Sequence, residues 1–200
     1  MDDGAPRETL PFVPPIRDLL REATGETHER LHRHGGLAAV AAGTIGREAY
    51  RSLLCRLYGF HQPFEIAAQI DQERTRWLEA DLAALGIDAA MLAALPRCAG
   101  FSAPASPEYL LGARYVIEGS ALGGRGLARQ LDGLLGCGIT AGRRFFSGNG
   151  HETGTAWRSY LAHLAAAPTA TASRAAIITG ATATFAIFEQ WLEGWNDQHG

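Results

Sequence analysis

Four glycines within eight residues interrupt a segment that otherwise reads as one continuous helix. They are Gly119, Gly123, Gly124 and Gly126. Ser106 and Pro107 suit the cap and the first position of that helix, and leucines recur with helical spacing as far as about Leu135. Each glycine costs a helix about 0.5–1 kcal/mol relative to alanine. Bare backbone lets a helix lie against a flat ligand or bend, although close helix packing or a linker between two shorter helices would also explain the glycines.

The length and composition indicate one globular domain preceded by a tail. Of the 200 residues, 46% are hydrophobic and 20% are charged, which suits a chain that buries a substantial core. Residues 1–15 are polar and rich in proline, so we expect a flexible tail there and a folded domain over residues 16–200. The net charge of −3 argues against a nucleic acid partner. No apolar run is long enough for a membrane span and no signal peptide is evident, so we expect a cytoplasmic protein with no membrane partner.

The three cysteines suit the same compartment. Cys55, Cys98 and Cys137 are odd in number, widely spaced and outside any CxxC pair. We therefore expect reduced thiols in the core rather than disulfides or a zinc site.

The hydrophobic pattern is helical, and no alternating stretch of useful length indicates a strand. Gly35 should stop the first helix and Pro63 should kink the second. Residues 136–154 should be rich in loops, with Phe145 and Phe146 folded back into the core. The expected helices are 16–34, 47–71, 72–85, 88–95, 106–135, 154–166 and 173–195. The pattern thus predicts a single-domain, all-α bundle.

The first expected helix carries a histidine on its apolar face. His28 shares that face with Leu20, Thr24 and Leu31 through spacings of three and four residues. A lone histidine there is most often a packed, hydrogen-bonded core residue. It can also be the axial ligand of a haem iron, opposite a face that glycines leave bare. His32 completes the spacing of a two-histidine metal pair, but no acidic third ligand stands at a recognised spacing, which disfavours zinc.

Two motifs occur in a fixed order along the chain. LREATGETH places a basic residue, Arg21, before Thr24 and His28, and YVIEGSALGGRGL contains the glycine cluster. FFSGNG followed by TAWRSYL, and the closing stretch TATFAIFEQWL, add weaker signals. Together, over residues 16–195, these motifs resemble the bacterial, biliverdin-producing haem oxygenases of the type found with bacteriophytochromes.

The resemblance implies a compact all-α bundle in which haem lies between a proximal helix and a kinked distal helix. Haem would be substrate and cofactor, opened oxidatively at a meso carbon to biliverdin, carbon monoxide and ferrous iron with O2. Electrons would come from a ferredoxin- or flavodoxin-type donor, and a bacteriophytochrome is one candidate recipient of biliverdin. The implied roles are iron ligation by His28, haem contacts by Arg21, Thr24, Tyr115 and Arg158, and catalysis around Gly119, Ser120, Gly123 and Gly124.

The sequence departs from the family pattern at two positions. Some members carry an aspartate directly after the first distal glycine, where this chain has Ser120, which brings a hydroxyl but no charge. Some carry a glutamate four residues after the ligating histidine, where this chain has His32. The proton-delivering group and the partner that orients His28 therefore stay open. Arg30 and Arg33 are candidates to meet an acidic electron donor.

Four functions remain open at this level. The first is a haem oxygenase, and the second is a haem-binding protein of the same fold without turnover, which Ser120 and His32 leave open. The third is a thiaminase-like, non-haem member of the fold, which needs a cysteine nucleophile with an acidic partner. The fourth is a helical interaction protein without a site.

Overall fold

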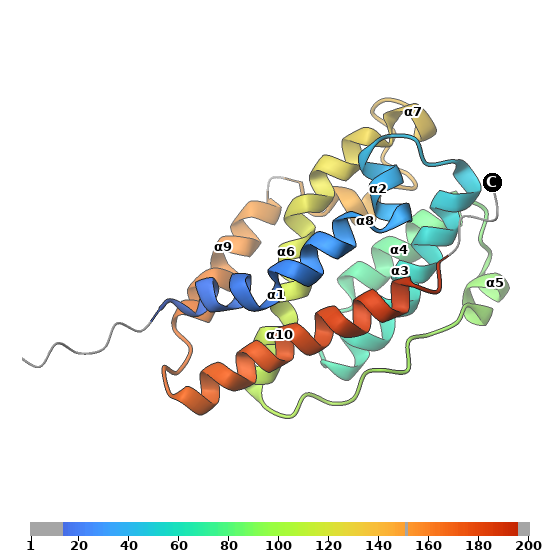
Figure 1. Cartoon of the computed structure of the whole chain (residues 1–200). Coiled ribbons are helices and arrows are strands. Elements are labelled where there is room, and N and C mark those ends of the chain that lie inside the picture. Colours follow the sequence, from blue (N-terminus) through green and yellow to red (C-terminus); the bar gives the residue numbers. More distant parts are fainter. Residues whose placement is uncertain (1–13, 151, 196–200) are drawn as a thin grey trace, which may run out of the picture.

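The computed structural model describes residues 14–150 and 152–195, and within these ranges the chain is helical with no strand (Figure 1). The longer helices are α1 (Ile16–His32), α3 (Arg47–Ala67), α4 (Glu73–Ala84), α6 (Pro107–Gln130), α9 (Glu152–Ala165) and α10 (Thr171–Leu192). The short ones are α2 (Gly35–Ala41), α5 (Ala89–Ala94), α7 (Asp132–Leu135) and α8 (Arg144–Ser147). The predicted all-α class is confirmed. Residues 1–13 of the predicted tail lie outside the described residues, and no described helix has the length and apolarity to cross a bilayer.

The contact between α6 and α10 is the most extensive in the bundle, and two glycines make it possible. A Cβ atom on Gly112 of α6 would lie 1.8 Å from the carbonyl oxygen of Ile177 on α10. Reciprocally, a Cβ on Gly180 of α10 would lie 2.0 Å from the carbonyl oxygen of Tyr109 on α6. The two backbones therefore meet directly, which no residue with a side chain would permit at either position.

The expected proximal and distal helices have the same neighbours. α1 packs along α10, as Figure 1 shows for the blue and red helices, and its other neighbours include α9. α6 also packs on α10 and α9, and in addition on α8. Tyr160 of α9 donates a hydrogen bond of 2.8 Å to the Leu111 carbonyl of α6, which ties these two helices together. Shared neighbours thus hold α1 and α6 in one part of the bundle.

Pro63 does not end α3, which continues to Ala67. A proline has no amide to donate to the carbonyl four residues earlier, here that of Gly59. The Cys98 amide donates to this carbonyl instead, at 2.8 Å. Gly59 also allows this approach, because a Cβ there would lie 2.5 Å from the Pro96 carbonyl oxygen. The segment after α5 therefore satisfies the backbone group that the proline leaves free.

The predicted helix over residues 106–135 ends earlier than expected. α6 stops at Gln130, a turn at Leu131 follows, and α7 is a separate short helix. The buried Arg143 side chain takes over carbonyls that the helix end leaves free, donating to Ala128 at 2.9 Å and to Leu131 at 3.4 Å. A guanidinium from a distant loop thus defines where the helix ends, which the leucine pattern did not reveal.

The predictions for Gly35, for the two phenylalanines and for the cysteines had different outcomes. The first helix ends at His32, before Gly35, and Gly35 is itself the first residue of α2. Phe146 is buried and Phe145 is partly buried against the core, as predicted. Cys98 is buried, but Cys137 is exposed, so the expectation of three core thiols was wrong for that residue.

We expect Gly112→Ala to lower the free energy of unfolding by about 3 kcal/mol or more, because the new methyl group would collide with backbone that cannot move aside. Gly126→Ala is the matched control on the same helix, since no atom lies within 4 Å of its Cβ position. That change should stabilise the protein by about 0.5–1 kcal/mol. Urea unfolding of both variants measures the difference, and equal midpoints would contradict the assigned contact.

Candidate functional site

Thr24 and His28 share one face of α1 but differ in their exposure to solvent. Thr24 is buried, and its hydroxyl donates to the Leu20 carbonyl at 2.7 Å. The side chain of His28, one turn further on, is 55% exposed. Thr24 therefore belongs to the core, and His28 is accessible to a ligand.

His28 is surrounded by an imidazole, a phenyl ring and a carboxylate. Its Nε2 atom lies 3.3 Å from Nε2 of His32, and the ring meets Phe185 of α10 edge-on, with centroids 6.3 Å apart. The Glu29 carboxylate is 3.9 Å from Nδ1. Burial and, secondarily, His32 lower the pKa of His28 below its ordinary value, against an opposing effect of Glu29. The imidazole is thus neutral near pH 7, the form that binds metals.

The glycines of α6 serve different purposes. Gly124 is buried, and a Cβ there would lie 2.9 Å from the Phe146 carbonyl oxygen of α8, so its small size is needed for packing. Gly119 faces the Trp157 ring, which would lie 3.6 Å from a Cβ. Gly123 and Gly126 have nothing within 4 Å of their Cβ positions. Gly123 is therefore the predicted catalytic glycine whose bare backbone faces open space.

An open hollow of about 590 Å³ lies beside these two glycines. Its lining is formed by Leu122, Gly123, Arg125, Gly126, Ala128 and Arg129 of α6 and by Ser147 of α8. Its volume falls within the usual range of small-molecule sites. Of the predicted site residues only Gly123 lines it, so the hollow adjoins α6 without reaching His28.

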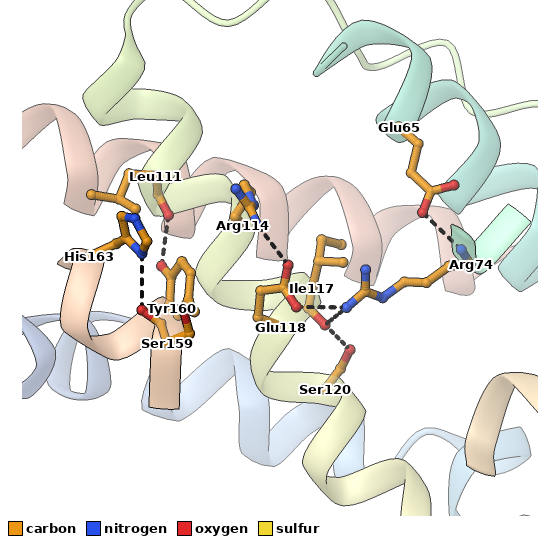
Figure 2. Close-up of polar contacts among 10 residues, drawn as sticks. All are labelled: Glu65, Arg74, Leu111, Arg114, Ile117, Glu118, Ser120, Ser159, Tyr160 and His163. Carbon is orange, nitrogen blue, oxygen red and sulfur yellow. Dashed lines mark hydrogen bonds and ion pairs between the residues drawn. The ribbon is translucent and has the colours of Figure 1, made fainter. Parts of the chain in front are cut away.

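The hydroxyl of Ser120 is already engaged. It donates to the carbonyl of Ile117 on its own helix at 2.9 Å (Figure 2). The same carbonyl accepts from Arg74 of α4 at 3.4 Å, and Arg74 also pairs with Glu118 at 2.9 Å. A polar network from another helix therefore meets α6 where the sequence lacks an aspartate.

Three predicted contact residues lie on α1, α6 and α9. Tyr115 packs its ring against Trp157, with centroids 5.8 Å apart. Burial raises the pKa of Tyr115, and the nearby cations Arg17 and Arg21 oppose that rise, so both arginines lie close to it. Arg158 of α9 is held by Thr155, which accepts its hydrogen bond at 2.9 Å. Arg17 was not among the predicted contact residues, although its spacing of four residues from Arg21 puts both on one face of α1.

Arg30 is committed within the fold. Its guanidinium forms a two-pronged ion pair with Glu189 of α10, at 2.5 and 2.9 Å. A second contact of 3.0 Å joins it to Glu26. It ties α1 to α10 just beside His28, and its meeting with an electron donor stays a prediction.

His61 of α3 is a buried imidazole that the sequence argument missed. It is 3% exposed, and its Nδ1 atom has no hydrogen-bond partner among the described residues. Its ring lies 5.0 Å from that of Phe145. Burial, with a smaller contribution from Arg74, lowers the pKa of His61 to about 3. The only sequence signal was a histidine within an otherwise apolar stretch, LYGFHQPF.

An accessible neutral imidazole on α1 and open glycine backbone on α6 define an α-helical protein suited to a planar ligand that contains a metal. The sequence model of the Heme oxygenase family matches residues 15–194. The chain therefore belongs to the haem oxygenase family, as the resemblance of its motifs predicted. No curated protein matches the chain closely enough to be informative.

Two solved structures show the same fold at low sequence identity. The haem oxygenase-1 of the cyanobacterium Synechocystis, in complex with haem, is 18% identical, with a TM-score of 0.72 over 90% of this chain and 91% of its own. The haem oxygenase of Leptospira interrogans is 16% identical, with a TM-score of 0.74 over 90% of this chain and 98% of its own. The predicted fold is confirmed, and the chain spans nearly the full length of both relatives.

We expect His61→Phe to reduce the loss of stability in mild acid. The folded protein keeps His61 neutral, whereas the unfolded chain binds a proton near the ordinary pKa of 6.5. The folded state therefore loses stability as the pH falls from 6.5 toward 3, by about 2 kcal/mol between pH 7 and pH 5. Urea unfolding at the two pH values measures this loss. His163→Ala, exposed on α9, should keep the wild-type dependence, and an unchanged dependence in His61→Phe would refute the assignment.

Proposed function

We propose that this haem oxygenase opens haem at a meso carbon to biliverdin, carbon monoxide and ferrous iron. The reaction would consume O2 and take electrons from a ferredoxin- or flavodoxin-type donor. One observation carries the proposal: the neutral, accessible imidazole of His28 is combined with the open backbone of Gly123 on a second helix that has the same neighbours.

The residues present fit a haem. A neutral imidazole is the donor that haem iron takes from a protein of this kind, and His28 supplies it. The space above Gly123 is free of side chains, so a flat macrocycle can approach the backbone there. Arg17 and Arg21 beside Tyr115, together with Arg158, can hold carboxylates by charge-assisted hydrogen bonds. Haem, when bound, supplies the iron chemistry that activates O2.

The residues of this chain would then control access and orientation. His28 would hold the iron from α1, and the neighbouring His32 ring would restrict how the His28 ring can turn. The bare backbone at Gly123 would keep side chains away from the side of the haem where O2 reacts. Ser120 presents its oxygen as an acceptor, since its proton is directed at Ile117. Arg17, Arg21 and Arg158 would hold the haem carboxylates and so favour one orientation of the substrate over others.

The thiaminase-like alternative receives no support from Cys55. Burial raises the pKa of the Cys55 thiol, which is the opposite of what a nucleophile needs. We therefore place the chain among the haem-degrading members of its fold. We further propose a cytoplasmic enzyme that supplies biliverdin to a bacteriophytochrome, on the strength of the sequence motifs alone.

The first test adds hemin to the purified protein and records the visible spectrum. We expect a sharp Soret band that His28→Ala abolishes or shifts, while His163→Ala retains it, because His28 lies on the proposed proximal helix α1 and His163 lies on α9. A reductant with O2, or a ferredoxin system, should then convert the spectrum to that of biliverdin. A Soret band without conversion would indicate a haem-binding protein without turnover, and no Soret shift at all would refute both functions.

The second test examines the distal face. We expect Gly123→Val to reduce turnover by about 100-fold, because the side chain fills the space above the backbone and displaces the reacting groups. The fold should persist, because nothing lies within 4 Å of the new Cβ. Ala121→Val is the matched control on the same helix. Normal biliverdin formation by Gly123→Val would contradict the assignment of α6 as the distal helix.

A further inference from the structure

Arg74 of α4 reaches Ile117 and Glu118 of α6, directly before the Gly119–Ser120 pair, as Figure 2 shows for Arg74, Glu118 and Ser120. Its Nη2 atom donates to Glu118 Oε2 at 2.9 Å and to the Ile117 carbonyl at 3.4 Å. The other carboxylate oxygen of Glu118 accepts from Arg114 at 3.1 Å. The side chains of Arg74 and Glu118 are only 12% and 16% exposed, so water weakens this ion pair little.

The backbone of Arg74 is fixed as firmly as its side chain. The Glu65 carboxylate of α3, which is fully buried, accepts from the amides of Arg74 and Thr75, both at 3.1 Å, and from the Thr75 hydroxyl at 2.5 Å. These amides lie in the first turn of α4, whose N-cap residue Gln72 makes no side-chain cap. A carboxylate at a helix N-terminus is also favoured by the helix dipole. Arg74 is thus anchored to α3 at one end and to α6 at the other.

The Ile117 carbonyl is where two donors from outside the helix ladder converge. The Ser120 hydroxyl donates to it at 2.9 Å and the Arg74 guanidinium at 3.4 Å. Back-bonding by serine and the entry of a side chain into the ladder both bend helices, and the Gly119–Ser120 pair follows directly. The position of the Ile117 carbonyl, and of the Gly119–Ser120 backbone that follows it, is therefore held by two hydrogen bonds besides those of the helix itself.

We propose that Arg74 is a positioning residue for the turn of α6 that carries Gly119 and Ser120. By holding the Ile117 carbonyl and Glu118, it fixes where Gly119 and the Ser120 hydroxyl lie relative to the reacting haem. The inference rests on the proposed function for its catalytic consequence, although the clamp itself exists without haem. The Arg74–Glu118 ion pair thus supplies a rigidity that Ser120, which brings no charge, cannot supply itself.

The clamp can be tested without haem. Hydrogen–deuterium exchange of the hemin-free protein should show amides 119–126 exchanging about tenfold faster in Arg74→Met, because a charged hydrogen bond to the helix is lost. Arg74→Lys, which keeps the charge but not the planar fork, should recover part of the protection. Arg76→Met is the matched control on the same helix, since Arg76 is 57% exposed and pairs only with the exposed Asp71 among the described residues. In Arg76→Met, amides 119–126 should exchange at the wild-type rate. The amides of α10 should exchange at the wild-type rate in every variant.

The catalytic consequence needs a second measurement on the hemin complex. We expect Arg74→Met to keep its hemin affinity within about threefold, because His28 on α1 is untouched, while kcat falls about tenfold or more. The distribution of biliverdin isomers should also broaden. This readout separates positioning from stability, because a change that only destabilises the protein would leave the distribution unchanged. Wild-type kcat and isomer distribution in Arg74→Met would overturn the positioning role.

The two measurements separate this inference from the proposed function. Unchanged exchange over residues 119–126 in a folded Arg74→Met protein overturns the clamp, whatever the wild type does with haem. Faster exchange supports the clamp even if the wild type makes no biliverdin, a result that would refute the proposed function instead. If Arg74→Met does not fold, Glu118→Gln removes the charge at constant size and should show the same local rise in exchange. Wild-type protection in Glu118→Gln would then overturn the clamp.

Discussion

The structure depends on the direct backbone contact between α6 and α10. Gly112 and Gly180 let the two helices meet without side chains between them, and α1 packs on α10 while α8 and α9 pack on α6. α10 carries Phe185, which meets the ring of His28, and Glu189, which holds Arg30 on α1. A wider separation would move α1 away from α6, and with it the imidazole from the glycines.

Around this contact, charged side chains from a loop and from α4 hold the backbone of α6 at two places. Arg143 takes up the carbonyls at its C-terminus, and Arg74 holds the carbonyl of Ile117 near its middle. Both side chains are largely shielded from water, so their hydrogen bonds are stronger than those of surface residues. Glycines lower the helix propensity of α6, and side chains from other elements hold its backbone in place.

Much of the architecture could be predicted from periodicity, because helical spacing and capping residues are local signals. The helix ends were less certain, since partners distant in sequence decide them, as Arg143 does for α6. At the site, the sequence correctly placed His28 on one helix and the four clustered glycines on another, α6. It could not foresee that Thr24 is core, that Gly124 packs on Phe146, or that His61 and Arg74 lie buried nearby.

The sequence by itself determined the helical class, the order of the two motifs and the bare backbone between Gly119 and Gly126, because each depends on residue type and spacing alone. Only the tertiary structure decided the use of each glycine: Gly112 meets α10, Gly124 meets α8, and Gly123 faces open space. It also decided that a guanidinium from α4 meets α6 at the turn where an aspartate is missing. The physical reason is that spacing fixes which residues share a helix face, whereas packing between helices fixes what that face meets.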